Sequence, residues 1–163
     1  MEYKDVDKNF EEAIGEYGGL ITKICYYFAS DSEEFKDLRQ EVFYNIWKGL
    51  DKFNQNSKLS TWIYRICFNT CISFRRKEKN VEKISLNLIT ELPDENRDST
   101  KLEEYKLMQT LIRRLKYEER ALILMWLDEM SYEEISALTG INRNTVAVRL
   151  KRIKEKLVEM ANN

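Results

Sequence analysis

The side chains of this sequence that could bind nucleic acid are concentrated on one predicted helix, at residues 142–157 (NRNTVAVRLKRIKEKL). Its apolar residues Val146, Leu150, Ile153 and Leu157 recur at helical spacing, so we expect them to form one buried stripe. At about 100° per residue, the polar residues project to the opposite side and its flanks. Lysine and arginine bind phosphates, whereas asparagine and small apolar side chains can contact base edges. The candidate DNA-contacting residues are Arg143, Asn144, Thr145, Ala147, Val148, Arg149, Lys151 and Arg152.

Capping signals make this helix the second of a pair. Ser131 followed by Glu134 is a capping box that begins a short helix. Gly140 falls where a helix ends in the left-handed conformation, and Asn142 is a good N-cap for the next helix. Together these signals predict a helix-turn-helix, whose second helix can enter the major groove. An amphipathic helical hairpin with a solvated basic face is the alternative that the pattern leaves open.

A second basic stretch, residues 60–77, places aromatic rings among polar side chains next to a polar loop at 51–59. Bases of a single strand stack on rings while cations hold its phosphates, so this side suits a single-stranded nucleic acid. The alternative is that most of these rings belong to the core, and for Trp62 we favour core packing. The side in question carries Arg65, Asn69, Ile72 and Arg76, with Trp62, Tyr64 and Phe68 close by.

An acidic face is predicted on the helix that begins after Asp31, where Asp31 and Glu34 form another capping box. Aromatic residues beside such a face are typical of a protein-docking surface. A face that is merely solvated would look similar, and the sequence leaves both possibilities open. The face comprises Asp37, Gln40, Glu41, Tyr44 and Lys48, with Trp47 at its edge.

The composition favours an all-helical protein. The 163 residues include only five Gly and one Pro, which argues against a turn-rich β fold. The net charge of −1 conceals a segregation, since residues 11–41 are acidic whereas residues 65–79 and 141–157 are basic. Separated patches of opposite sign suggest two kinds of partner, with nucleic acid expected at the basic ones.

Cofactor and metal chemistry are not expected. The chain has no His, and Cys25, Cys67 and Cys71 lack the spacing of a zinc site, so we interpret them as core residues in a reducing cytoplasm. Without His, a Gly-rich phosphate loop or a matched carboxylate pair, the sequence also argues against an enzyme. It shows no signal peptide and no long apolar run, so we expect neither secretion nor membrane insertion.

Apolar periodicity predicts about seven helices in two small domains. Residues 1–78 form the first domain, and residues 79–100, polar and containing the only Pro, form a flexible linker. Residues 101–163 form a second domain of four helices that includes the helix-turn-helix. Its first helix is predicted to turn Leu107, Leu111 and Leu115 inward.

Three stretches resemble the extracytoplasmic-function sigma factors, the two-domain initiation subunits of bacterial RNA polymerase. DLRQEVFYNIW at 37–47 resembles the family's DxxQExF helix. Residues 53–77 resemble its TWLYRIxxN-RR segment, and residues 115–157 resemble its second domain. The three motifs occur in the family's order and cover nearly the whole chain.

The resemblance implies a role for each surface and a location in the cytoplasm, at the nucleoid. The acidic face would dock the β′ clamp helices of core RNA polymerase, and the β flap and an anti-sigma protein are further expected partners. The 54–59 loop would capture a flipped base of the minus-ten element, since promoter melting needs a pocket for an unstacked base. The basic helix would read the minus-thirty-five element. The implied minus-ten residues are Asn56, Ser57, Lys58, Trp62, Arg65, Asn69, Arg75 and Arg76.

The sequence departs from the family pattern at three positions. Ala147 and Val148 stand where Lys or Arg followed by Ser is usual, and Ser136 replaces a usual Ala. The two apolar residues could contact a thymine methyl group. The minus-thirty-five sequence therefore does not follow from the resemblance.

Two non-enzymatic functions compete with an initiation factor. A dimeric helix-turn-helix regulator could bind an operator without being a polymerase subunit, although the last predicted helix ends at Met160 with no dimerisation arm after it. A pure protein-interaction module would leave both basic patches unexplained.

Overall fold

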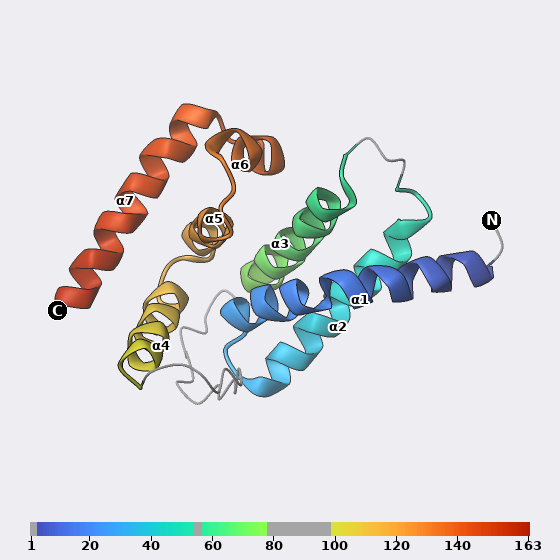
Figure 1. Cartoon of the computed structure of the whole chain (residues 1–163), viewed down its shortest axis with the longest axis horizontal. Helices are drawn as coiled ribbons and strands as arrows, with labels where there is room; N and C mark the ends of the chain where they lie inside the picture. The colour runs from blue at the N-terminus through green and yellow to red at the C-terminus, as the bar shows by residue number, and fades with distance from the viewer. Residues whose placement is uncertain (1–2, 54–56, 78–98) are drawn as a thin grey trace. The chain divides into compact units, whose positions relative to one another are not determined.

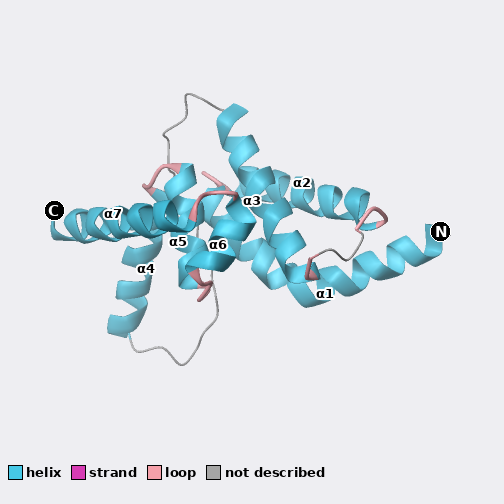
Figure 2. Ribbon diagram, turned by 90° about the horizontal axis from the view of Figure 1, so that it is seen from above, coloured by secondary structure: helices cyan, strands magenta, loops and turns pink. Residues whose placement is uncertain are grey.

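The computed structural model describes residues 3–53, 57–77 and 99–163, and in these ranges the chain folds entirely into helices and connecting turns (Figures 1 and 2). This confirms the predicted all-helical fold. The helices are α1 (Tyr3–Phe28), α2 (Ser32–Leu50), α3 (Leu59–Lys77), α4 (Ser99–Arg113), α5 (Tyr117–Leu127), α6 (Tyr132–Thr139) and α7 (Arg143–Asn162).

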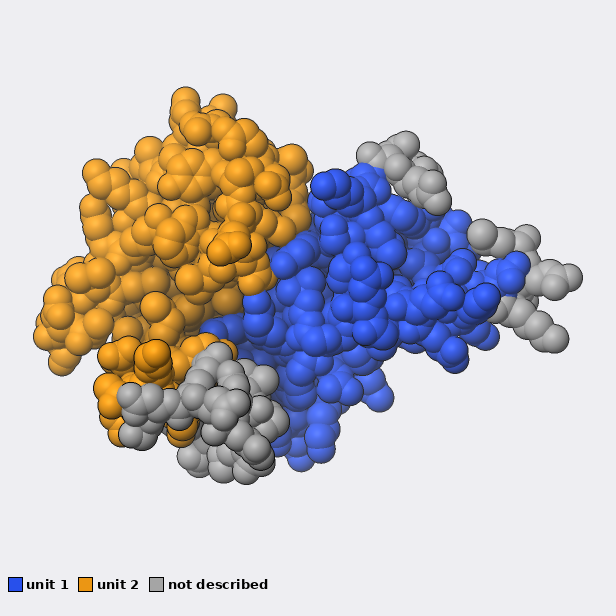
Figure 3. All heavy atoms as spheres, in the orientation of Figure 1, with its two compact units in different colours: residues 1–81 blue, residues 82–163 orange. Residues whose placement is uncertain are grey.

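The chain divides into two compact units, residues 1–81 and 82–163 (Figure 3). Unit 1 contains α1–α3, and unit 2 contains the four helices α4–α7, with the helix-turn-helix at α6 and α7. The division falls inside the predicted linker. Most of that linker, and Asn56 of the predicted loop, lie outside the described residues.

In unit 1 each helix packs against the other two. Leu38, Val42 and Ile46 line the buried face of α2, as their spacing predicts. Asn45 Nδ2 donates a hydrogen bond of 3.0 Å to Thr70 Oγ1, which joins α2 to α3. Phe68 was expected near the polar side of α3, but it is only 2% exposed and meets Phe28 edge to face at 6.2 Å between ring centroids. Its ring is therefore part of the core.

The N-terminus of α2 is capped, but only half of the predicted capping box forms. Asp31 accepts a hydrogen bond of 2.8 Å from the Glu34 backbone N–H. The Glu34 carboxylate turns instead to Ser30, accepting from its N–H at 3.1 Å and from its hydroxyl at 2.7 Å. The other carboxylate contact is an ion pair with Arg75 of α3, so Glu34 links two segments rather than closing its own helix end.

In unit 2 the short helix α5 is surrounded by the other three. Five consecutive residues of α5, from Ala121 to Met125, are buried, because α5 contacts α4, α6 and α7. On α4, Leu111 is buried as expected, whereas Leu107 is 50% exposed and the prediction for it is wrong. Burial in α4 begins at Gln109, since only the C-terminal third of the helix is covered.

Candidate nucleic-acid interface

The turn between α6 and α7 is fixed by hydrogen bonds of its own side chains. Ser131 accepts from the Glu134 N–H at 3.1 Å, which confirms the N-cap half of this capping box, whereas the Glu134 carboxylate accepts from the Ser131 hydroxyl instead of the Ser131 backbone N–H. Gly140 has φ 77°, the left-handed conformation that favours glycine. The Ser136 hydroxyl donates to the Ile141 carbonyl at 2.6 Å, a bond that the alanine usual at this position would lack. Asn142 then caps α7 by accepting from the Asn144 N–H at 2.9 Å.

Helix α7 turns one stripe inward and presents the opposite side to solvent. Val146, Leu150 and Ile153 are buried, as their spacing predicts. Leu157, the fourth residue of the predicted stripe, is only half-buried. Thr145 and Ala147 are half-buried at the edge of that stripe. The exposed residues of the N-terminal half of the helix, 143–152, are Arg143, Asn144, Val148, Arg149, Lys151 and Arg152.

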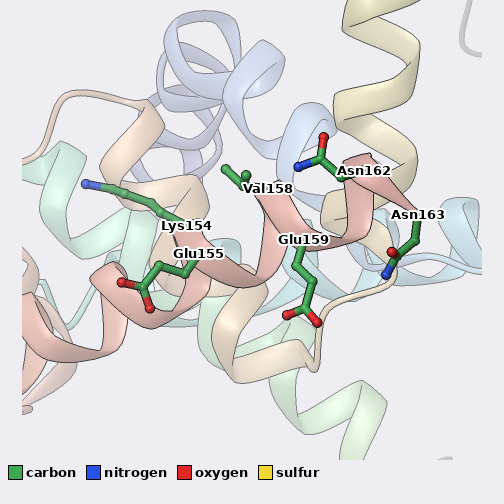
Figure 4. Close-up of a pocket in the computed structure, with 6 residues that line it drawn as sticks. All are labelled: Lys154, Glu155, Val158, Glu159, Asn162 and Asn163. Carbon is green, nitrogen blue, oxygen red and sulfur yellow. The ribbon is translucent and has the colours of Figure 1, made fainter.

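The C-terminal part of α7 has a different character. Figure 4 shows the residues that line a hollow of about 530 Å³ along this part of the helix, Lys154, Glu155, Val158, Glu159, Asn162 and Asn163. Its charges are of both signs, and the Lys154 ammonium lies 3.8 Å from the centroid of the Trp126 ring of α5. The predominantly basic surface of α7 is therefore its N-terminal part.

The first residue of α7 has a specific acidic partner. Arg143 Nε donates to Glu133 Oε1 of α6 at 2.5 Å, and its guanidinium lies 5.7 Å from the centroid of the Tyr132 ring. The hydrogen bond from Arg143 lowers the pKa of the Glu133 carboxyl below its usual range. Arg149, Lys151 and Arg152, by contrast, form no ion pair with the described residues.

In unit 1 the structure brings several of the implied minus-ten residues onto one helix. Asn69 and Arg76 are exposed on α3, and Arg65 is half-buried. Lys58, just before α3, is exposed, and Ser57 is half-buried. These residues offer cations and an amide to a ligand approaching α3 from solvent.

Arg75, by contrast, is held inside unit 1. Its side chain is 11% exposed, its Nε donates to the Phe28 carbonyl at 2.6 Å, and its guanidinium pairs with Glu34. We therefore leave Arg75 out of the candidate nucleic-acid surface. Sequence reasoning missed this bond because Phe28 lies 47 positions earlier in the chain.

Trp62 packs on the C-terminal end of α2. Its ring lies 5.2 Å from the Phe53 ring, centroid to centroid. A Cβ atom added to Gly49 would come within 3.0 Å of the Trp62 ring, so a glycine there allows the close approach. Trp62 is half-buried, which is in keeping with the core packing that we favoured for it and leaves part of the ring accessible.

The residues of the predicted acidic face of α2 all lie on its solvent-exposed side. Asp37, Gln40 and Glu41 are exposed, and Tyr44 is 56% exposed. The Tyr44 ring stacks on Trp47 at 6.4 Å, and Trp47 Nε1 donates to Asp7 of α1 at 3.2 Å. The face therefore combines negative charge with two ordered aromatic rings.

The three cysteines lie in the core of unit 1. Cys25, Cys67 and Cys71 are buried free thiols. Burial raises the pKa of Cys67 and Cys71 well above the ordinary value of 9.0, and neighbouring Cys25 adds to the effect. Within the described ranges, no three His, Cys, Asp or Glu residues are grouped so that they could hold a metal ion. In the same ranges, no helix has the length and apolar character that crossing a bilayer requires.

Both units match known families. Residues 13–81 match Sigma-70 region 2, and residues 105–157 match Sigma-70, region 4. Over 94% of this chain and 91% of the relative, the sequence is 27% identical to the ECF RNA polymerase sigma factor SigW of Bacillus subtilis. It is 30% identical to the RNA polymerase sigma factor SigZ of the same organism, over 93% of this chain and 86% of the relative.

Solved structures share the fold. The sigma factor RpoE of Bartonella quintana, in complex with the anti-sigma factor NepR, matches with a TM-score of 0.73 and 20% identity, over 95% of this chain and 98% of that one. CnrH, in complex with the cytosolic domain of CnrY, matches with a TM-score of 0.67 and 20% identity, over 96% of this chain and 89% of that one.

Proposed function

The chain belongs to the ECF sigma factors of the sigma-70 family, and on that premise we propose that three of its exposed surfaces have separate roles in transcription initiation. It is a polymerase-associated initiation factor that directs promoter recognition. Sigma factors are regulatory subunits rather than enzymes, and they act in the cytoplasm on RNA polymerase. We propose nucleoid association for this chain, because its proposed ligand is promoter DNA. A regulator that works without polymerase is not favoured, because regions 2 and 4 are both present.

The first proposed surface is the acidic face of α2, which docks the β′ clamp helices of core polymerase. The supporting observation is the exposure of Asp37, Gln40, Glu41 and Tyr44 on one side of a well-packed helix. Exposed carboxylates attract a basic partner over about one Debye length, and an ordered aromatic ring supplies apolar contact area.

The second proposed surface is the solvent side of α3, which binds the opened minus-ten strand. Asn69 can hydrogen-bond an extruded base, because its amide both donates and accepts. Lys58, Arg65 and Arg76 hold the backbone nearby. Ser57 and the accessible edge of Trp62 border this surface, and Asn56, which we also assign to it, lies outside the described residues.

The third proposed surface is the N-terminal part of α7, which reads the duplex minus-thirty-five element. Asn144, Ala147, Val148, Lys151 and Arg152 face the bases. Arg143, Thr145 and Arg149 hold the phosphates on the flanks. The observation that carries this assignment is the burial of Val146, Leu150 and Ile153, because it leaves one side of the helix for the groove.

We also propose contacts with the β flap and with an anti-sigma protein. A sigma factor of the same fold has been solved with its anti-sigma factor bound. An anti-sigma protein that covered the acidic face of α2 would prevent polymerase binding without unfolding either unit.

A charge reversal tests the first surface. Glu41→Lys should greatly reduce capture of the chain by a β′ clamp-helix fragment, because it places a cation where the partner's cations must lie. Removing one partner of a desolvated charge pair costs about 2–5 kcal/mol at an interface. Glu12→Lys, an equal reversal on the exposed side of α1, is the matched control and should bind normally. Equal capture of both variants would show that the polymerase docks elsewhere.

A further inference from the structure

The contact between Glu133 and Arg143 gives the helix-turn-helix an internal competitor for DNA. The two side chains come from different helices and meet across the turn, with Arg143 Nε 2.5 Å from Glu133 Oε1. Both remain open to solvent, at 53% exposure for Arg143 and 64% for Glu133. A phosphate approaching the N-terminus of α7 therefore meets a cation that is accessible and already paired.

The pairing sets Arg143 apart from the other cations of this surface. Arg149, Lys151 and Arg152 have no acidic partner among the described residues, so their charge is available to a phosphate without prior exchange. Arg143 must loosen or share its bond to Glu133 before it can hold a phosphate with full strength. Glu133 also adds a negative charge next to the place where that phosphate would lie.

We propose that Glu133 is an internal counter-ion that competes with the DNA backbone for Arg143 and lowers the affinity of α7 for duplex DNA without changing its base preference. The inference rests on the proposed phosphate contact of Arg143. Base preference is unaffected because the contested ligand is the phosphate, which carries no sequence information directly.

An orienting role for Glu133 is the competing interpretation. It would require Arg143 to lose its position when the carboxylate is removed. Arg143, however, has a second support, since its guanidinium lies over the Tyr132 ring at 5.7 Å from the centroid. The ring keeps the guanidinium beside α6 and adds no negative charge, so removing the carboxylate charge releases the cation without releasing the side chain.

The direct test is Glu133→Gln in the full chain, titrated with a labelled random-sequence 20-base-pair duplex by fluorescence anisotropy. The variant keeps the size of the side chain and removes its charge. Affinity at low salt should rise about two- to fivefold, the range expected when one exposed ion pair no longer competes. The slope of log affinity against log salt should steepen by up to about one unit, because one more phosphate is fully neutralised.

Glu159→Gln is the matched control. It removes one carboxylate charge from α7, about 24 Å along that helix from Arg143 and well beyond the Debye length of about 8–10 Å. Its affinity should stay within error of wild type. An equal increase in both variants would overturn the inference, because net charge alone would then explain it.

A double-mutant cycle with Arg143→Ala separates the inference from the function on which it rests. Arg143→Ala should weaken binding, and adding Glu133→Gln to it should recover less than half of the gain seen with Arg143 present. Unchanged or weaker binding by Glu133→Gln would show that Glu133 orients Arg143 instead. If Arg143→Ala alone leaves affinity and salt slope unchanged, the phosphate contact proposed for Arg143 fails.

Discussion

Replacing Arg75 distinguishes the role that the sequence resemblance implies for this residue from the role that its contacts indicate. The resemblance places Arg75 on promoter DNA, whereas in the structure it ties the C-terminal turn of α3 to the α1–α2 corner. Its Nε donates to the Phe28 carbonyl, and its guanidinium pairs with Glu34. We expect Arg75→Ala to destabilise unit 1 and to change DNA binding only through that loss of stability.

The magnitude follows from what is left unpaired. A hydrogen bond from a charged donor contributes about 1.5–3 kcal/mol, and breaking a buried ion pair costs about 3–5 kcal/mol. The Glu34 side chain keeps 13% exposure and two hydrogen bonds from Ser30, which reduce the second cost. We expect a total of about 3 kcal/mol. A domain of this size is stable by about 4–12 kcal/mol, so the loss is a large fraction.

Urea unfolding followed by circular dichroism, with hydrogen exchange of α1 and α3 amides, measures the effect on unit 1. Arg75→Lys should recover only part of the stability, because an ammonium lacks the planar fork of the guanidinium that reaches both partners. Lys77→Ala, at an exposed site in the same turn, is the control and should lie within about 0.5 kcal/mol of wild type. Glu34→Gln combined with Arg75→Ala should cost less than the sum of the single changes.

One result would refute this reasoning. If Arg75→Ala unfolds no more easily than Lys77→Ala and yet binds single-stranded DNA less tightly, Arg75 contacts the nucleic acid and the internal contacts contribute little.

Three further predictions follow from the structure. Asn69→Ala should leave duplex affinity nearly intact and reduce permanganate reactivity of thymines in the opened promoter; equal loss of both signals would indicate a structural role for the side chain. Cys67 and Cys71 should resist iodoacetamide at pH 8 until the chain unfolds, because burial raises their pKa, and rapid labelling of the native chain would contradict this. Since the two thiols lose their protons at lower pH in the unfolded chain than in the folded chain, the stability of unit 1 should also fall as pH rises above the ordinary thiol value of 9.0. Ser136→Ala should lower the thermal stability of unit 2 by about 1 kcal/mol, because the Ile141 carbonyl loses its 2.6 Å bond, and an unchanged Tm would show that water replaces the hydroxyl at no cost.

The features predicted correctly from sequence depend on short-range signals. Ser131, Gly140 and Asn142 act on backbone groups within four residues of themselves, so their types and spacing were sufficient to place the helix-turn-helix. The inward stripe of α7 could be predicted equally well from the sequence, because residues at helical spacing share a face whichever helix covers that face.

The features that could not be predicted depend on neighbours distant in the chain. Phe68 and Asn69 are adjacent on α3, and both were expected on or near its polar side. Phe68 is buried because its ring packs against Phe28 of α1, whereas Asn69 stays exposed. Leu107 continues a regular apolar stripe, but burial of α4 begins two residues later, at Gln109. Arg75 fits the basic pattern of DNA-binding residues as well as Arg76 does, and partners more than 40 positions away decide its role.

Run-off transcription with core RNA polymerase on a library of genomic fragments, with sequencing of the start sites, tests the central claim most directly. The chain should direct initiation at discrete positions, each preceded by a shared minus-ten and a shared minus-thirty-five element at constant spacing. In the same assay Lys151→Ala should change the preferred upstream element alone, and Glu41→Lys should abolish the specific starts. Start sites identical to those of core polymerase alone would contradict the account.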